Sequence, residues 1–275
     1  MESDWGDWLP TAVSAADPDT VAVWYLGCNG FVLKGREGTT VYIDPYVGTG
    51  DPPRTVRMIP VPFDPADVTD ADAVLATHEH TDHVHGETQG PILANSEATF
   101  YGPGASVAVT QEENWQSAYD LGTDQFETVS AGESFELGEF TVHVEYAHDP
   151  DAADPVSYVF EHDTGVFFHG GDTKPDAGLE RVGDEYDIDL GALAFGSPGM
   201  IPDKQTREPT YTKWYSDEAE VVEAARLLDL DRLLPTHWDM WKGLTANPEA
   251  LRPHVRSFDA PDRLELAEIG DRVDL

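Results

Sequence analysis

The stretch Leu75–Gly86, LATHEHTDHVHG, places four histidines, one glutamate and one aspartate in twelve residues. The whole chain has ten histidines, so this concentration is far from its average composition. The segment 71–77, ADAVLAT, runs into the stretch and is apolar, which is typical of a buried β-strand. The histidines therefore begin where a buried strand ends, at a point where loops commonly carry functional side chains.

The spacing within this cluster is His78-x-His80-x-Asp82-His83. Neutral imidazole and carboxylate are the usual ligands of zinc and are acceptable ligands for manganese or iron. Alternating residues that leave a strand end point the same way, so His78 and His80 aim apart from Asp82 and His83. Four ligands divided in this way predict two metal ions rather than a solvated, histidine-rich loop.

Three further residues are candidate ligands because each follows an expected strand and sits beside Gly, Pro or Asp. They are His148 in VEYAHDP, Asp172 in FFHGGDTK and His237 in LLPTHWDMW. Alone, a histidine at a strand end is more often a hydrogen-bonded polar group than a ligand. The six-residue cluster changes that balance, because a two-ion site needs ligands from outside its own loop.

The motif THEHTDH resembles the signature of the metallo-β-lactamase superfamily, and the later order His, GDT, His also resembles that superfamily. WYLGCNGFVLK and VYIDPY resemble its first strands, with Asp44 in the place of an early structural aspartate. FFHGGDT, ALAFGSPG and LLPTHWDMW resemble the L-ascorbate 6-phosphate lactonase group, whereas IPDKQTREPTYTKWYS, residues 201–216, does not match it. The resemblance implies that His78, His80 and His148 hold one ion, that Asp82, His83 and His237 hold the other, and that Asp172 bridges them.

The order of elements predicts an α/β fold. Residues 21–46 read as three short strands, 98–102 as another strand, and 105–122 as one helix that closes at Gly122. A second strand-rich stretch covers 126–169, followed by strands at 191–195 and 232–236 and a helix over 216–230 capped by Ser216. Two similar halves without a linker predict a four-layer αββα sandwich of the metallo-β-lactamase type with mixed sheets. We expect residues 1–275 to form one domain.

The composition describes a folded, strongly acidic protein. Asp and Glu number 53 against 16 Lys and Arg, a formal net charge of -37, while 40% of residues are hydrophobic. Such a surface suits concentrated salt, so we expect the cytoplasm of a salt-accumulating microbe, with an ordinary acidic protein as the alternative. Nucleic acid and anionic membranes are unexpected partners, because both are bound through clustered basic residues.

The single cysteine, Cys28, excludes an internal disulfide and is expected to be a packing residue rather than a nucleophile. The N-terminal MESDWGDWLP has neither a basic start nor an apolar core, which predicts no signal peptide and no membrane anchor. Both observations fit a reducing, cytoplasmic location. The sequence leaves open whether the chain forms a homo-oligomer.

The chemistry that these residues predict is metal-dependent hydrolysis. Two divalent ions, zinc or manganese, would share a bridging hydroxide as the nucleophile, with Asp82 handling its proton. The favoured substrate is a lactone of a small anionic sugar acid, and Lys204 and Arg207, with Lys213 nearby, are candidate contacts for its anionic group. A cyclic or other small-molecule phosphodiesterase is the alternative on the same site, and a metal-binding protein without turnover is a third.

Overall fold

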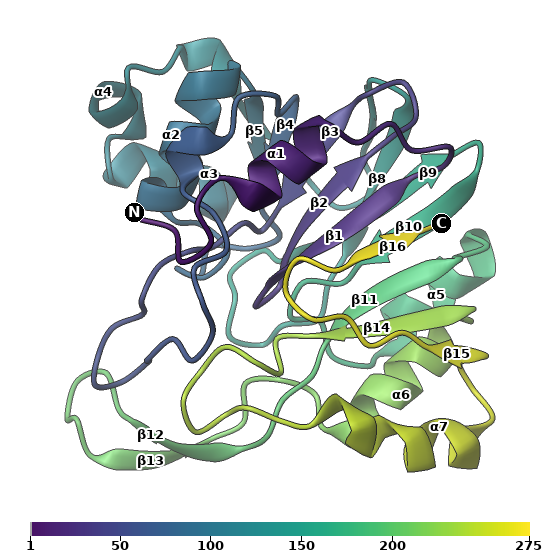
Figure 1. The fold of residues 1–275 in the computed structure, drawn as a ribbon. Coiled ribbons are helices and arrows are strands. Elements are labelled where there is room, and N and C mark those ends of the chain that lie inside the picture. The colour runs from purple at the N-terminus through teal and green to yellow at the C-terminus, as the bar shows by residue number, and fades with distance from the viewer. Residues whose placement is uncertain (1) are drawn as a thin grey trace.

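The computed structural model describes residues 2–275, whose strands form two seven-stranded sheets and one two-stranded hairpin (Figure 1). The first sheet has the order β16 (Arg272–Asp274), β1 (Ala22–Gly27), β2 (Gly30–Lys34), β3 (Thr40–Ile43), β4 (Ala73–Leu75), β5 (Thr99–Gly102) and β6 (Phe126–Thr128). The second has the order β15 (Arg263–Leu264), β14 (Arg232–Thr236), β11 (Leu190–Ala194), β10 (Gly165–His169), β9 (Val156–His162), β8 (Phe140–Tyr146) and β7 (Ser134–Leu137).

Both sheets are mixed, and they are built in the same way. Strands β1 to β3 pair antiparallel and β3 to β6 pair parallel, while β7 to β10 pair antiparallel and the path from β10 through β11 and β14 to β15 is parallel. The C-terminal β16 closes the first sheet by pairing antiparallel with β1. The α/β fold with mixed sheets and the two similar halves are therefore confirmed.

Three apolar layers hold the sheets and helices together. The central layer lies between the two sheets and contains, for example, Tyr25, Phe31, Phe140 and Phe160, each at most 1% exposed. A second layer packs helices α1 (Trp8–Ser14), α2 (Gly86–Ser96), α3 (Gly104–Glu112) and α4 (Trp115–Tyr119) on the first sheet. A third packs α5 (Ala177–Glu185), α6 (Glu218–Leu227) and α7 (Leu251–Phe258) on the second. Each fully buried large apolar side chain contributes about 1.5–3 kcal/mol, so these layers dominate the stability.

Two expectations about the helices were wrong. The single helix expected over 105–122 is two helices, because Asn114 adopts a left-handed backbone with φ 57° and ends the first. The cap of α6 is Asp217 rather than Ser216: its carboxylate accepts hydrogen bonds from the amides of Ala219 and Glu220. The side chain of Glu220 completes the capping box by accepting from the Asp217 amide.

Other elements were not expected at all. Helix α2 follows the histidine cluster despite containing two glycines and Pro91, and it is held by burying Ile92 and Leu93 against the first sheet. The segment 201–216 contains most of a hairpin of β12 (Gly199–Pro202) and β13 (Pro209–Thr212), which extends away from the two sheets in Figure 1. Short 3-10 turns lie at η1 (Pro65–Asp67), η2 (Thr123–Gln125) and η3 (Pro248–Ala250). Across residues 2–275, no helix combines the length and apolar character that crossing a membrane requires.

Candidate metal centre

Segments that follow the carboxyl ends of strands from both sheets supply every group of the centre. The turn after β1 carries Cys28 and Asn29, and the loop after β4 carries the histidine cluster. Loops after β8, β10 and β14 carry Asp149, Asp172 and His237. In α/β folds, ligands bind beside the carboxyl ends of the strands, and this chain gathers its chemistry at that edge.

The first group of candidate ligands contains His78, His80, Asp149 and Asp172, whose ligand atoms lie within 4.8 Å of one another. His78 Nε2 and His80 Nδ1 are 2.9 Å apart, and Asp149 Oδ2 lies 3.8 Å from the former and 4.0 Å from the latter. His80 is fixed from its other nitrogen, because Nε2 lies 3.2 Å from the carbonyl oxygen of Asp151. These imidazole nitrogens and carboxylate oxygens converge as they would around one divalent ion.

The second group contains His83, Asp172 and His237. The Oδ1 atom of Asp172 lies 3.6 Å from His83 Nε2 and 3.5 Å from His237 Nε2. His83 is fully buried, and its Nε2 has no hydrogen-bond partner among the described residues. An unpaired buried nitrogen is costly unless something binds it, so this atom shows that the group fits a cation.

A third group shares His237 and adds Asp82 and Cys28. Asp82 Oδ2 lies 3.4 Å from His237 Nε2, and Trp241 Nε1 donates a 3.2 Å hydrogen bond to the same oxygen. Cys28 is completely buried, as expected of a packing residue, but its Sγ also lies 3.6 Å from His237 Nε2. The sequence interpretation of Cys28 missed this neighbourhood.

A buried carboxylate behind the histidines orients them. Asp44 accepts hydrogen bonds from the Thr77 amide and hydroxyl at 2.8 Å each, and its Oδ2 lies 2.8 Å from His83 Nδ1. With Nδ1 engaged by Asp44, His83 presents Nε2 to the centre, which is how outer carboxylates commonly fix a ligating imidazole. The structural role implied for Asp44 thus has a concrete geometry.

A second supporting chain runs through Asn29 to Asp172. The side-chain nitrogen of Asn29, Nδ2, donates to Asp172 Oδ1 at 3.3 Å, and the side-chain oxygen of Asn29 accepts from the Thr236 hydroxyl at 2.8 Å. The imidazole of His169 lies behind this turn, with Nε2 2.9 Å from the Asn29 carbonyl oxygen. His169 therefore supports the centre through Asn29 and is not among its candidate ligands.

The charges of the centre suit cation binding. Burial, reinforced by the neighbouring His83, lowers the pKa of His78 to about 3, so its imidazole is neutral near pH 7. Burial opposes ionisation of Asp172 and of Asp82, but the adjoining histidines, His237 and His83, outweigh it and lower the pKa of both carboxyls. Neutral imidazole and ionised carboxylate are the forms that bind metals. Burial opposes a charge on His83, but Asp44 and Asp172 outweigh it and raise its pKa, so His83 would release a proton when an ion binds.

Six of the seven predicted metal ligands lie in these groups: His78, His80, Asp82, His83, Asp172 and His237. The seventh, His148, is in none of the groups found among the described residues, and Asp149 takes part instead. Consecutive side chains of an extended segment point to opposite sides, and here Asp149 faces the centre. The backbone of His148 is held by Thr173 Oγ1 at 2.9 Å and by the Lys174 amide at 2.9 Å.

The predicted basic residues lie on or beside the β12–β13 hairpin. Lys204 and Arg207 occupy its exposed turn, and the Arg207 guanidinium is 3.5 Å from Asp51 Oδ2. Lys213 is engaged elsewhere, with Nζ 2.7 Å from Asp217 and 2.8 Å from Glu220. Of the three, Lys204 has no ion pair among the described residues, and Arg207 has one contact at 3.5 Å, longer than the two that hold Lys213, so Lys204 and Arg207 are the more available for binding an anion.

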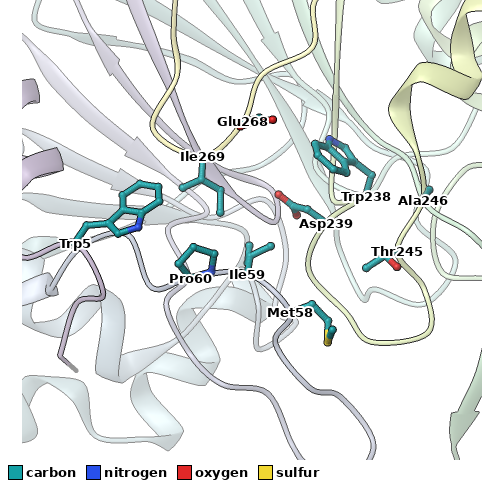
Figure 2. Close-up of a pocket in the computed structure, with 10 residues that line it drawn as sticks. All are labelled: Trp5, Met58, Ile59, Pro60, Trp238, Asp239, Thr245, Ala246, Glu268 and Ile269. Atoms are coloured by element: carbon teal, nitrogen blue, oxygen red, sulfur yellow. The ribbon is translucent and has the colours of Figure 1, made fainter.

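A pocket of about 440 Å³ adjoins the loop that carries His237 (Figure 2). Its wall is formed by Trp5, by 58–60, by residues of the 238–246 segment and by Glu268 and Ile269, and it includes none of the predicted metal ligands. Asp239 connects the pocket to the centre, because its carboxylate accepts from the Cys28 amide at 3.1 Å and from the Tyr25 hydroxyl at 2.9 Å.

Comparison with known proteins agrees with this geometry. Residues 39–238 match the family described as the Beta-lactamase superfamily domain. The chain is 26% identical over 295 aligned residues to the probable L-ascorbate-6-phosphate lactonase UlaG of Escherichia fergusonii, covering 90% of this chain and 78% of the relative.

Solved structures show the same fold at lower identity. Igni18, a metallo hydrolase from Ignicoccus hospitalis, is 19% identical with a TM-score of 0.67, covering 93% of this chain and 98% of its own. An isothiocyanate hydrolase from Delia radicum gut bacteria is 16% identical with a TM-score of 0.69, covering 92% and 98%. At these identities the likeness establishes the shared architecture.

Proposed function

The chain belongs to the Beta-lactamase superfamily domain family and has the fold of its metal-dependent hydrolases, and on that premise we propose that it is a lactonase for a small anionic sugar acid. The observation that carries the proposal is that six predicted ligands fall into three groups linked by Asp172 and His237, one of which contains the unpaired, fully buried His83 Nε2. The likeness to probable ascorbate-6-phosphate lactonases supports the choice of substrate class. We assign the activity to residues 1–275 as one domain.

We propose a centre for two divalent ions, zinc or manganese. His78 and His80 would hold one ion with Asp149, whose position supports it over the predicted His148. Asp82, His83 and His237 would hold the other, and Asp172 lies between the two groups as the bridging carboxylate. When bound, such ions act as Lewis acids and bring the pKa of water from about 15.7 toward about 7.

The chain's own residues would position and relay protons. Asp82 is the proposed proton-handling residue, and Trp241 restrains it by donating to Oδ2. Among the described residues, Oδ1 of Asp82 accepts no hydrogen bond. Asn29 restrains Asp172 in the same way through Oδ1. Both carboxylates therefore keep a fixed direction, and a fixed direction matters because misplacement by about 1 Å can cost about a hundredfold in rate.

The test compares three substrate classes on the full-length protein loaded with zinc or with manganese. We expect hydrolysis of sugar-acid lactones, with a phosphorylated lactone preferred over its neutral counterpart. Protein treated with a chelator should be inactive and should recover on metal addition. Faster hydrolysis of cyclic or acyclic phosphodiesters would favour the phosphodiesterase alternative, and no turnover of lactone, phosphodiester or thioester would support a non-catalytic metal-binding protein.

A further inference from the structure

Glu79 lies between two candidate ligands, His78 and His80, but it belongs to none of the ligand groups found among the described residues. Its Oε1 atom accepts a 2.9 Å hydrogen bond from the backbone amide of Ala153, 74 positions further along the chain. The other oxygen, Oε2, is buried and has no hydrogen-bond partner within residues 2–275. A buried carboxylate oxygen without a partner lowers stability, so packing alone does not account for an acid at this position.

Ala153 belongs to the segment 149–154, which we call the Asp149 loop. It lies between β8 and β9 and supplies Asp149 to the first ligand group. Within the loop, the Asp151 amide donates to Asp149 Oδ1 at 3.0 Å, and the Ala152 amide donates to the Asp149 carbonyl oxygen at 3.3 Å. These bonds make the loop a compact turn, so a contact at Ala153 also restrains the carboxylate of Asp149.

The same loop orients His80. The Nε2 atom of His80 lies 3.2 Å from the Asp151 carbonyl oxygen, and this nitrogen carries the hydrogen because a carbonyl oxygen can only accept. The unprotonated nitrogen is then Nδ1, which lies 2.9 Å from His78 Nε2 and 4.0 Å from Asp149 Oδ2. The Asp149 loop therefore supplies one ligand and determines which nitrogen of another faces the centre.

The far end of the loop is anchored separately. The Val156 amide donates to the Thr77 carbonyl oxygen at 2.9 Å, and the carboxylate of Asp154 accepts from an amide in the first turn of α3 at 3.2 Å. Before these points, the contacts that Glu79 and His80 make join the loop to the histidine cluster. The contact from His80 comes from the ring that is itself being oriented, so Glu79 provides the independent restraint.

We propose that Glu79 is a positioning residue for the ion held by the first ligand group. By accepting from the Ala153 amide, it holds the Asp149 loop against the histidine cluster, so that the Asp149 carboxylate and His80 Nδ1 keep the separation that an ion requires. This role rests on the proposed metal centre and goes beyond it, because it assigns a function to a residue outside the ligand groups. The second ligand group has no member on the loop and should not depend on Glu79.

The experiment measures zinc affinity by titrating the zinc-loaded, full-length protein with a chelator and fitting a dissociation constant for each ion. Glu79→Ala should raise one constant by about 10–100-fold, as is typical when an outer partner of a metal ligand is lost, and should leave the other unchanged. Glu79→Gln keeps a side-chain oxygen that can accept from Ala153, so it should restore most of the affinity.

Glu139→Ala is the matched control. The Glu139 carboxylate also accepts from amides of a distant segment, those of Glu37 and Thr39, but it precedes β8, whereas the centre lies beyond the other end of that strand. Its loss should change neither zinc constant.

A second variant tests the hydrogen bond from the other side. Ala153→Pro removes the donating amide and leaves Glu79 intact, so it should weaken the same ion. The double variant should bind zinc no more weakly than the more affected single variant, because both changes remove one bond. Ala153→Pro decides the question even where Glu79→Ala does not fold.

The outcomes separate the role of Glu79 from the centre itself. Unchanged zinc affinity in Glu79→Ala and Ala153→Pro, or additive losses in the double variant, would overturn that role and leave the proposed hydrolase intact. An equal rise of both constants that Glu139→Ala shares would show a general loss of stability and would also overturn it. Wild-type protein that binds no zinc would overturn the metal centre and, with it, the proposed lactonase.

Discussion

The backbone amide of His237 donates a 2.6 Å hydrogen bond to the carbonyl oxygen of Cys28, 209 positions earlier in the chain. Both residues have positive φ, 65° and 60° respectively. The bond joins the β1–β2 turn of the first sheet to the loop after β14 in the second. Because each sheet supplies part of the centre, this bond makes the ligand geometry depend on how the two sheets pack.

Asp172 is the carboxylate on which the two halves of the centre depend. We expect Asp172→Ala to abolish turnover and to reduce bound metal below two ions per chain, because Oδ1 lies between His83 and His237. The core lies in the apolar layers, so the variant should remain folded. Elemental analysis, circular dichroism and lactone turnover check this together. Activity within a few-fold of the parent would remove Asp172 from the centre.

The choice between His148 and Asp149 gives a second prediction. We expect Asp149→Ala to lose one ion and most activity, and the matched variant His148→Ala to keep both ions. The Asp149 carboxylate lies 3.8 Å from His78 Nε2 and 4.0 Å from His80 Nδ1, whereas His148 is in none of the candidate groups found among the described residues. Metal content of the two purified variants measures the difference directly. Loss of an ion from His148→Ala alone would restore His148 as the ligand.

Our proposal of Asp149 in place of the predicted His148 is supported by a shift in the alternation of strand β8. Val142 and Val144 are buried, so the alternation extrapolates to the next even positions and to His148. Instead Tyr146 is exposed and Ala147 is buried, which shifts the alternation by one residue before the loop. A one-residue slip leaves no mark in the sequence, whereas the fixed spacing around His78 could be read directly.

The sheets were predictable for a related reason. β-branched, aromatic and apolar runs predicted β1 to β5, β11 and β14. All of these except β5 are buried along almost their whole length, which dictates their composition. Helix α2 was not predictable, because glycine and proline have low helix propensity. Its stability comes from packing against the first sheet, which the local sequence does not show. The position of Cys28 beside His237 was equally hidden, since it depends on a turn meeting a loop from the other sheet.

The stability of the metal-free protein should be greatest near pH 6.5. The pKa of His78 falls from 6.5 to about 3 on folding, through burial and then His83, so its contribution to stability is lost as the pH drops below about 6.5. Burial opposes a charge on His83, but Asp44 and Asp172 outweigh it and raise its pKa, so its contribution is lost as the pH rises above about 6.5. Burial also lowers the pKa of His85 and of His169, which adds to the acid limb. Each single histidine contributes a slope of at most about 1.4 kcal/mol per pH unit.

Urea unfolding of chelator-treated protein across this pH range measures the effect. His78→Gln should make the acid limb less steep, with His85 and His169 accounting for the slope that remains, and His83→Gln should make the alkaline limb less steep. A profile that rises or falls monotonically through pH 6.5 would contradict the prediction. The measurement belongs in high salt, where the acidic surface contributes less to the pH dependence.

The acidic surface predicts that the protein needs salt to remain folded, as proposed for a salt-accumulating microbe. A formal net charge of -37 repels itself strongly where the Debye length is about 30 Å, near 0.01 M salt, and weakly where it is about 3 Å, near 1 M. The midpoint of thermal unfolding should therefore rise with potassium chloride. A midpoint that does not change, or that falls, would point to an ordinary acidic protein.

The β12–β13 hairpin yields the last prediction, which concerns how an anionic substrate is held. If Lys204 and Arg207 contact its phosphate or carboxylate, replacing both by Gln should raise KM for the anionic lactone and leave a neutral lactone almost unaffected. A charge-assisted hydrogen bond contributes about 1.5–3 kcal/mol, so kcat/KM should fall by roughly ten-fold or more. Lys213→Gln is the matched control, because that lysine is already paired with Asp217 and Glu220 and should affect both substrates alike. Metal content should not change in either variant, since none of these lysines or the arginine belongs to the ligand groups. Equal losses on anionic and neutral lactones in the double variant would show that these two residues have a structural role, with Arg207 holding the hairpin through its ion pair with Asp51.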